Sequence, residues 1–536
     1  MFNLKRIFTN YRFKKHNRKI FDVNSNIKNK GKILVEFNAF ATTHIPMSYF
    51  SNILSKKYNS KIVAAYNYFL VVNDFKNSFF MKLKWSIGKL FQLNFFGIYS
   101  SFGTSDFILP QSDEYTKKRK NRFIFKIKKK IKKKEDILKI KINSVLVGDI
   151  IYDTYLKRYK KETIILNNEF YGYFDQFVEL FYYWENFFEA NNIKATVGHH
   201  SVYSYAIPLR ISINRNIPTF VINCMDMCQL NEKNMLTNFQ YLDYKKNFKS
   251  LNYKYRKEAI KFSKQKLLSR VSGKINLNEV DYISKSAFKD DSNRITKPTK
   301  SKKIKVLIAT HDFFDAVHCY GDLILPDFYE WIRFIGKHSK NTNIEWFIKT
   351  HPDFDGKFKI SQNYTSKIVN RLIKEFPHIK LIKNNTSHLE IIKKGINFVF
   401  TCFGSITMEY AFFNVIPINA APNNPFKNYK FGIHPKNKSE LKNIILNLNK
   451  YKNFKISKKD LYEFFYMSYY FNPRNFFIKD YNEMIKFVDG YDGQFTYKLY
   501  EYWIKKYNYN NHNKRLDILK KFINSKDYFF IKKKYL

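Results

Sequence analysis

Short, strongly apolar segments alternate with helical segments along most of this chain, and this alternation restricts the fold more than any other feature of the sequence. The pattern begins with KILVEF at residues 32–37 and KIVAAY at 61–66, and it starts afresh with KVLIAT at 305–310. Strands that alternate with helices are typical of a parallel, doubly wound sheet, because each parallel connection must cross back over the sheet. The sequence therefore predicts an α/β fold.

A polar stretch separates two sets of these strand and helix units. Residues 284–303 contain KDDSNRITKPTKSKK and show no apolar periodicity, which is typical of a linker. We expect two Rossmann-like domains facing a central cleft, where the carboxyl ends of the strands hold ligands. The expected parts of the chain are a basic leader at 1–30, an N-terminal domain at 31–283, the linker at 284–303, a C-terminal domain at 304–450 and a helical C-terminal segment at 451–536.

The composition and the apolar runs exclude several classes of protein. Hydrophobic residues make up 45% of the 536 residues, which is too many for a disordered chain. No signal-peptide core and no run of about 18 apolar residues occurs, so we expect a cytoplasmic protein. The four cysteines have neither a metal-ligand spacing nor a paired framework, so we expect free thiols.

The chain is strongly basic. Lysine and arginine number 95 against 45 acidic residues, and the formal net charge of +50 attracts the phosphates of nucleotides, lipids or nucleic acids. Part of this excess fits an AT-rich coding bias, since Lys, Asn, Ile, Phe and Tyr are abundant together. The densest basic run, 117–134, either contacts an anionic inner membrane or forms a solvated helix. No nucleic-acid-binding motif occurs, so we expect no nucleic-acid partner.

The sharpest motif is KTHPD at residues 349–353, directly after the expected strand EWFIKT. At the carboxyl end of a strand, His351 would lie where ligands bind, and it could donate a hydrogen bond to a phosphate or protonate a leaving group. Lys349 would add a positive charge unless strand alternation turns it away. The alternative is a structural histidine in a turn.

A second motif, TCFGSITME at residues 401–409, also lies between an expected strand and an expected helix. Gly404 permits a tight turn, and the Ser405 hydroxyl, with the N–H groups of the following turn that contains Thr407, suits a phosphate. Glu409 lies one helical turn after Ser405 and suits ribose hydroxyls. The alternative is an N-capping serine followed by an exposed glutamate.

Together, KTHPD and GSITMEYAFFNVIPINA resemble the donor half of bacterial GT-B glycosyltransferases that build capsules and other surface polysaccharides, over about residues 300–440. The motifs are similar to those of Kdo and sialyl transferases, which use CMP-activated sugars, and of polyol-phosphate transferases, which use CDP-glycerol. The resemblance implies that His351 contacts the donor phosphate or assists its departure, that Ser405 holds phosphate and that Glu409 binds the nucleotide. It also implies a nucleotide-sugar donor, a polysaccharide or lipid-linked acceptor, and no cofactor or metal.

Three residues after the first strand of the C-terminal domain are further candidates: His311, Asp312 and His318. They could suggest a metal site, but the resemblance favours contact with the donor or acceptor. A structural His–Asp pair is the alternative.

In the N-terminal domain, an acidic side chain could remove the proton of the acceptor hydroxyl. Glu36 is the first candidate and Asp149 the second, since each is expected just past a strand that ends at the cleft. His200 closes the segment ATVGHH and is a candidate for substrate binding, whereas Arg210 is expected at the surface. A capping or hydrogen-bonding role is the alternative for either acid.

Three other functions fit parts of the pattern. An epimerase of UDP-linked amino sugars can have the same two-domain architecture and needs no acceptor. The charge alone would suit a nucleic-acid-binding protein. A catalytically inactive scaffold of a capsule assembly complex would show no turnover.

Overall fold

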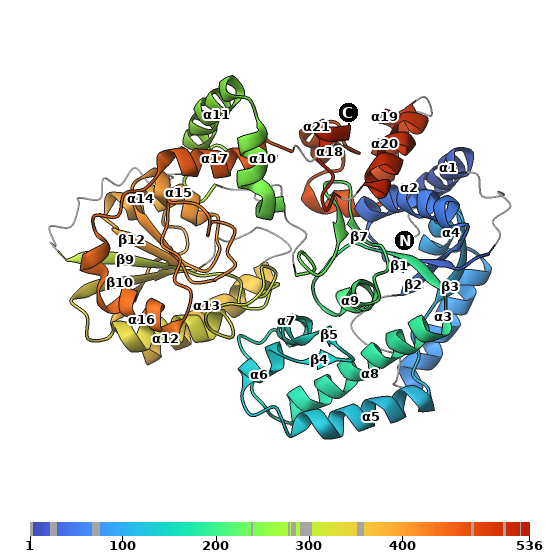
Figure 1. The fold of residues 1–536 in the computed structure, drawn as a ribbon, viewed down its shortest axis with the longest axis horizontal. Helices are drawn as coiled ribbons and strands as arrows, with labels where there is room; N and C mark the ends of the chain where they lie inside the picture. The colour runs from blue at the N-terminus through green and yellow to red at the C-terminus, as the bar shows by residue number, and fades with distance from the viewer. Residues whose placement is uncertain are drawn as a thin grey trace. The chain divides into compact units, whose positions relative to one another are not determined.

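The computed structural model describes residues 4–21, 29–66, 75–236, 240–276, 279, 286–289, 303–350, 359–472, 476–507, 511–525 and 527–535. The chain divides into two compact units, which are described separately (Figure 1). Unit 1 comprises Met1–Thr154, Ile165–Asn238 and Pro473–Leu536, and unit 2 comprises Tyr155–Ile164 and Phe239–Asn472. Each unit therefore draws on separate parts of the chain.

Unit 1 is built on a six-stranded sheet in the order β3-β2-β1-β6-β7-β8. All neighbouring strands are parallel except β7 and β8, which pair antiparallel at one edge. Buried apolar side chains fill most of β1, β2 and β7, as expected for strands covered on both faces. The strands are β1 (Lys32–Phe37), β2 (Lys61–Tyr66), β3 (Thr104–Ile108), β6 (Ile193–Gly198), β7 (Thr219–Ile222) and β8 (Met227–Leu230).

The helices of unit 1 come from both ends of the chain. They are α1 (Leu4–Ile20), α2 (Ala41–Tyr58), α3 (Phe75–Leu90), α4 (Phe95–Ser100), α5 (Glu114–Lys128), α6 (Lys134–Leu138), α7 (Gly148–Tyr159, which continues into unit 2), α8 (Asn168–Ala190), α9 (Ile207–Asn214), α18 (Tyr481–Phe487), α19 (Tyr497–Lys506), α20 (His512–Asn524) and α21 (Lys532–Tyr535). A small hairpin of β4 (Lys141–Ile142) and β5 (Val145–Leu146) lies apart from the main sheet.

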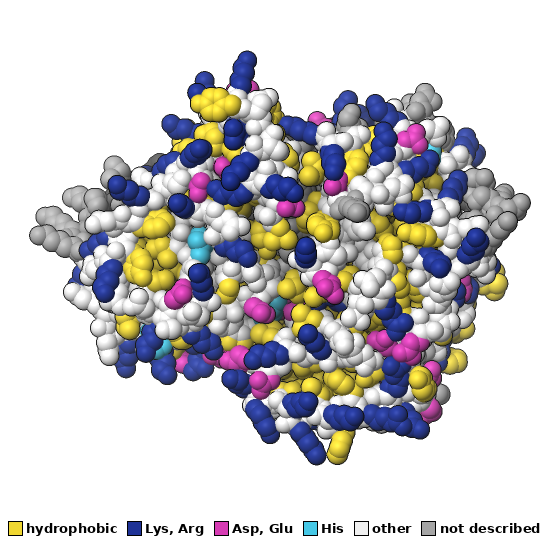
Figure 2. Space-filling view, viewed as in Figure 1, with side chains coloured by type: hydrophobic (Ala, Val, Ile, Leu, Met, Phe, Trp, Pro, Cys, Tyr) yellow, Lys and Arg dark blue, Asp and Glu magenta, His cyan; other side chains and the backbone are white. Residues whose placement is uncertain are grey.

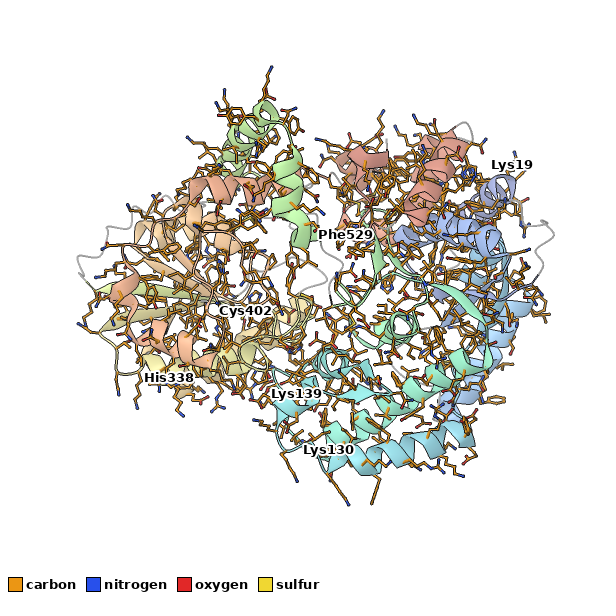
Figure 3. The ribbon with its side chains drawn as sticks, in the orientation of Figure 1. Lys19, Lys130, Lys139, His338, Cys402 and Phe529 are labelled. Atoms are coloured by element: carbon orange, nitrogen blue, oxygen red, sulfur yellow. The ribbon has the colours of Figure 1, made fainter. Side chains whose placement is uncertain are left out.

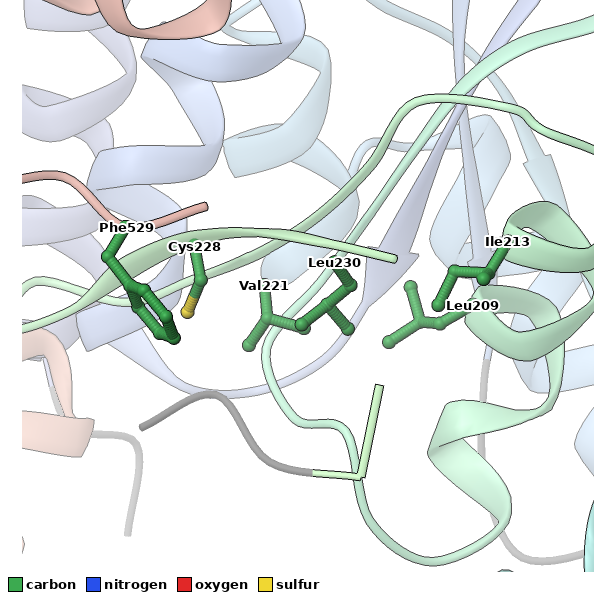
Figure 4. Packing of buried hydrophobic residues seen from close by; sticks show 6 residues of the cluster. All are labelled: Leu209, Ile213, Val221, Cys228, Leu230 and Phe529. Carbon is green, nitrogen blue, oxygen red and sulfur yellow. The ribbon is translucent and has the colours of Figure 1, made fainter. Parts of the chain in front are cut away.

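One cluster of the unit 1 core shows how the C-terminal residues join the sheet (Figure 4). Leu209 and Ile213 of α9 point towards Val221 of β7 and Leu230 of β8. Phe529 packs against the same cluster, and its backbone forms an antiparallel bridge with Cys228. Burial of such side chains stabilises the fold by roughly 1.5–3 kcal/mol each.

Unit 2 has a five-stranded parallel sheet in the order β11-β10-β9-β12-β13. The central strand β9 is buried along its whole length. Because the strand order reverses between β9 and β12, a crevice is expected beyond their carboxyl ends. The strands are β9 (Ile304–Ala309), β10 (Ile344–Lys349), β11 (Ile379–Leu381), β12 (Phe398–Thr401) and β13 (Ile416–Asn419). The helices are α10 (Tyr244–Ser250), α11 (Tyr253–Val271), α12 (Phe328–Ser339), α13 (Lys359–Glu375), α14 (His388–Lys393), α15 (Ile406–Phe412), α16 (Lys438–Leu446) and α17 (Lys458–Tyr469).

The α/β fold class is confirmed, both sheets are parallel apart from the antiparallel edge strand β8, and all five strands expected in unit 2 are present. The polar segment 38–46, which in the sequence is typical of a loop between two strands, is helical from Ala41 onwards. The polar residues there serve the start of α2: Thr43 Oγ1 donates to Asn38 Oδ1 at 2.8 Å and to the carbonyl of Phe40 at 2.7 Å. Within the described residues, we find no helix with both the length and the apolarity needed to cross a bilayer.

Candidate functional site

Unit 2 contains a pocket of about 220 Å³ at the carboxyl ends of β9, β10 and β12. Figure 3 marks this edge of the sheet by Cys402, the residue that follows β12. Five of the residues expected at the site line the pocket together: His311, Lys349, Gly404, Ser405 and Glu409. They come together because neighbouring parallel strands end at the same edge.

Lys349, the last residue of β10, is buried and faces the pocket. Its Nζ donates a hydrogen bond to the carbonyl oxygen of Asn384 at 2.6 Å, and the neighbouring Thr350 hydroxyl bonds the Asn384 side chain. Burial lowers the pKa of Lys349 to about 8. Lys349 thus lines the pocket while its ammonium group bonds to Asn384, and a pKa of about 8 leaves it mostly charged near neutral pH.

His311 follows β9 and is held by the end of β12. Its Nε2 accepts the N–H of Cys402 at 3.2 Å and lies 3.0 Å from Thr401 Oγ1. Since a backbone N–H can only donate, Nε2 is the unprotonated nitrogen of the neutral ring. The ring also stacks on Phe328, with centroids 4.4 Å apart. These contacts fix the orientation of the imidazole at the pocket wall.

Gly404 allows the close approach between the end of β12 and His311. A Cβ atom at this position would lie 2.9 Å from Thr401 Oγ1 and 3.6 Å from His311 Cε1. The Gly404 N–H also donates to Thr401 Oγ1 at 3.3 Å. A side chain here would push the loop away from β12, so the glycine fits a compact turn at the pocket.

Ser405 and Glu409 are joined by Arg270, the penultimate residue of α11. Arg270 Nε donates to Glu409 Oε1 at 2.8 Å, and Nη2 lies 3.5 Å from Ser405 Oγ. Ser405 makes no capping hydrogen bond to α15, and Glu409 is buried. The alternative of a capping serine with an exposed glutamate therefore does not describe this site.

Arg270 lies between two carboxylates. Nη1 is 3.6 Å from Glu279 Oε2, on the side away from Glu409. Burial opposes its charge, but the charges of Tyr469, Glu409 and Glu279 together raise the pKa of Arg270. The guanidinium is thus permanently charged and held at the pocket wall, where a third anion would find further N–H donors.

The sequence reasoning missed several lining residues, among them Arg270, Glu279 and His388. Arg270 belongs to a helix rich in lysine and arginine, so no local signal distinguishes it. His388 begins α14, and its Nδ1 lies 2.8 Å from the Tyr410 hydroxyl. His388 lies seven positions after the end of β11, so a strand-end pattern like the one at His351 does not select it.

Other candidates of the C-terminal half do not line the pocket. Thr407 is buried and donates to Asn419 Oδ1 at 2.6 Å. Asp312 accepts the N–H of Phe314 at 3.2 Å, and buried His318 has its Nε2 3.0 Å from the carbonyl of Pro326. His351 lies outside the described residues.

Glu36 forms a carboxylate–imidazole pair with His199 in unit 1. Glu36 Oε1 lies 2.6 Å from His199 Nδ1, and Oε2 accepts the backbone N–H of His199 at 3.0 Å. The pair forms because β1 and β6 are adjacent and parallel. His200 lies beside it, with ring centroids 5.7 Å apart. Glu36 is the penultimate residue of β1 and not just past it as expected, whereas His199 and His200 directly follow β6.

Asp149 was expected just past a strand of the main sheet, but it does not follow one. The strand before it is only Val145–Leu146, and Asp149 lies in the first turn of α7. Its Oδ2 is 2.6 Å from Nη2 of Arg210, which is 2% exposed and therefore not at the surface. Arg210 also donates to the carbonyl of Leu146. Asp149 thus neutralises a buried guanidinium.

No group of metal-ligating side chains occurs among the residues that the structure describes. The four cysteines are free thiols, as expected.

No protein-family model matches this chain, and no curated protein matches it. Solved structures with some likeness include the β-Kdo 2,4-transferase KpsC of Thermosulfurimonas dismutans (11% identity, 51% of this chain and 79% of that one, TM-score 0.29). A glycosyltransferase of Rickettsia africae is 11% identical over 93% of this chain and 100% of its own, with a TM-score of 0.24. A UDP-GlcNAc 2-epimerase of Methanocaldococcus jannaschii is 12% identical over 80% of this chain and 97% of its own, with a TM-score of 0.22. At such TM-scores these likenesses carry no argument about function, which therefore rests on the site.

Proposed function

We propose that this chain is a cytoplasmic glycosyltransferase that moves a sugar from a nucleotide-activated donor to a growing surface polysaccharide or a lipid-linked acceptor. The observation that carries the proposal is the unit 2 pocket, which gathers Lys349, His311, Ser405 and Arg270 at the carboxyl edge of a Rossmann-like sheet. This is the edge at which open α/β sheets bind nucleotides. The motif resemblance favours a CMP- or CDP-linked donor.

In this proposal the donor phosphate lies against the cations of the pocket. Lys349 supplies a compact ammonium group, and Arg270 supplies a fixed guanidinium whose other bonds hold Glu409. The Ser405 hydroxyl, 3.5 Å from Arg270 Nη2, adds a hydrogen bond to the same phosphate. Such fixed donors stabilise the charge that develops on the leaving group, without a metal ion or another cofactor.

The reaction is a displacement at the activated carbon of the donor sugar. The acceptor oxygen forms the new C–O bond, and the bond to phosphate breaks, with the electron pair leaving on the nucleotide. His351, two residues after Lys349 in the chain, is proposed to donate a hydrogen bond or a proton to that phosphate. Glu409, held by Arg270, is proposed to face the ribose of the nucleotide.

The proton of the acceptor hydroxyl needs a base, and Glu36 remains our first candidate. Its pairing with His199 offers two groups that can share this proton. Asp149 ranks lower, because its carboxylate is already engaged in an ion pair with buried Arg210.

The proposal is tested by transfer assays with CMP-, CDP- and UDP-linked donors, in the presence and absence of a lipid-linked acceptor. We expect nucleotide release that depends on the acceptor, and we expect His351→Ala to abolish it while the melting temperature stays at the parent value. Loss of one stabilising donor at a comparable site costs about 3–4 kcal/mol of transition-state stabilisation. An unchanged rate in His351→Ala would remove His351 from the mechanism.

The same assay separates the alternatives. An epimerase would convert the donor sugar without any acceptor, and a scaffold would release no nucleotide under any condition. Either result would overturn the proposed function.

A further inference from the structure

Helix α1 exposes an apolar stripe. Leu4, Ile7, Phe8 and Tyr11 follow the spacing i, i+3, i+4, i+7, and each is more than half exposed. The opposite face packs into unit 1, where Phe13 stacks on Tyr500 with ring centroids 4.2 Å apart. The exposed stripe is thus separate from the face that holds the helix in place.

Helix α3 likewise has one face packed into unit 1 and one exposed apolar face. Its inner face packs through Trp85, whose ring lies 4.9 Å from that of Phe96, and through Gly88, where a Cβ atom would lie 2.5 Å from Phe96 Cε2. Its outer face and the turn after it carry large apolar residues that are 42–75% exposed: Phe80, Leu83, Ile87, Leu90 and Phe91. Nothing within unit 1 covers this second stripe among the described residues.

The two helices flank the short helix α4 on the same unit (Figure 1). Arg6 of α1 lies over the Phe95 ring of α4 at 5.9 Å, and Gly88 of α3 abuts the next residue, Phe96. Neither α1 nor α3 contains an aspartate or a glutamate. Exposed cations lie beside both stripes, including Lys15 on α1 and Lys84 on α3.

We propose that α1 and α3 form a docking surface for an anionic lipid bilayer, which we call the α1–α3 surface. Apolar stripes bordered by lysine and arginine, without acidic residues, suit helices that lie in the membrane interface. There the apolar side chains enter the acyl boundary, while the cations meet lipid phosphates and add about 1 kcal/mol each. Because α1 and α3 are positively charged and the whole chain is strongly basic, they favour an anionic lipid surface over a second copy of the chain.

This surface differs from the basic run 117–134. There Ile124 of α5 and Ile131 after it are buried and pack within unit 1, and Phe125 is the exposed exception. The run is therefore strongly basic but has no continuous apolar stripe.

The test is co-sedimentation of the full chain with vesicles of phosphatidylcholine alone, or of phosphatidylcholine with an equimolar amount of phosphatidylglycerol. The α3 variant carries Leu83→Gln, Leu90→Gln and Phe91→Gln, and a separate α1 variant carries Leu4→Gln, Ile7→Gln and Phe8→Gln. The control variant carries three substitutions of equally exposed residues elsewhere: Tyr115→Gln, Phe125→Gln and Tyr253→Gln.

We expect the parent and the control to prefer anionic vesicles, and each of the α1 and α3 variants to bind at least about tenfold more weakly. Unchanged melting temperatures would show that the exposed substitutions leave the fold intact. The proposal fails if the α1 and α3 variants bind like the parent, if the control weakens equally, or if the parent forms dimers that these variants dissociate.

Discussion

Lys349 shows how its surroundings set the chemistry of one side chain. Burial lowers its pKa to about 8, from an ordinary value of 10.5. Between about pH 8 and pH 10.5, Lys349 is protonated in the unfolded chain and deprotonated in the folded chain. In this range its contribution makes the free energy of unfolding increase with pH. Below about pH 8 the folded protein carries the ammonium that a phosphate needs.

The first prediction concerns nucleotide affinity as a function of pH. In the parent, the dissociation constant of a bound nucleotide should increase as the pH rises above about 8, because Lys349 loses its charge. Lys349→Met should bind more weakly and lack this dependence. Isothermal titration calorimetry at several pH values measures both effects.

The control is Lys305→Met, another buried lysine of the same sheet. Its Nζ donates to the carbonyl of Lys394 at 2.8 Å, and it does not line the pocket. This variant should keep the pH dependence of the parent. A parent affinity that stays constant from pH 7 to pH 10 would exclude Lys349 as a phosphate ligand.

At the residue scale, the sequence predicts the side chains that lie at strand ends, and it fails where a partner comes from a distant segment. His311, Lys349 and Ser405 line one pocket because each follows, or ends, a strand of the same parallel sheet. Arg270 bonds to Glu409, which lies 139 positions away in the chain, and no pattern near residue 270 predicts that contact. The position of Arg270 depends on the packing of α11 against other helices of unit 2.

At the scale of elements, the turn between β12 and α15 shapes the pocket. Gly404→Ala would place a Cβ atom 2.9 Å from Thr401 Oγ1. We expect the loop to shift and nucleotide affinity to fall about tenfold, because ligand groups must be held within about half an ångström of their productive positions. Calorimetric titration measures the loss.

Gly172→Ala is the matched control for that substitution. Gly172 lies inside α8, and a Cβ atom there would meet nothing within 4 Å. This variant should bind nucleotide like the parent and gain roughly 0.5–1 kcal/mol in stability, as alanine is the better helix former. Equal affinity in the Gly404→Ala variant would show that this turn does not contact the ligand.

The elements of unit 2 could be predicted better than those of unit 1, for a physical reason. Strands buried on both faces, such as β9 and β12, read as continuous apolar runs with clear ends. In unit 1, β3 has three of five residues partly or fully exposed and therefore gives little apolar signal. The polar residues at the start of α2 are typical of a loop, but Thr43 there donates to the backbone of Phe40 at the helix start.

At the scale of the whole molecule, discontinuous segments build each unit. Unit 2 takes α11 from before the polar stretch 284–303, and unit 1 takes the chain from Pro473 onwards. The domain limits expected from sequence follow chain order and remain predictions. Strand and helix patterns describe neighbours along the chain, so they contain no information about which unit a returning segment joins.

The high net charge is likewise a property of the whole molecule. Figure 2 shows lysine and arginine side chains scattered over the visible face, with few acidic groups among them. The charge of +50 therefore attracts polyanions in general, and it does not locate a site. The site is located instead by the pocket in which Lys349 of β10 and Arg270 of α11 meet the polar groups that follow β9 and β12.

The most direct test of the central claim, that this pocket binds the nucleotide of the donor, is a thermal-shift screen of the parent and Lys349→Met against CMP, CDP, UDP and GDP. A nucleotide at 100 times its dissociation constant stabilises the folded protein by about 2.7 kcal/mol. We predict that CMP or CDP raises the melting temperature of the parent, and that Lys349→Met loses most of this shift while Lys305→Met keeps it. If no nucleotide stabilises the parent, or if Lys349→Met responds as strongly as the parent, the claim is contradicted.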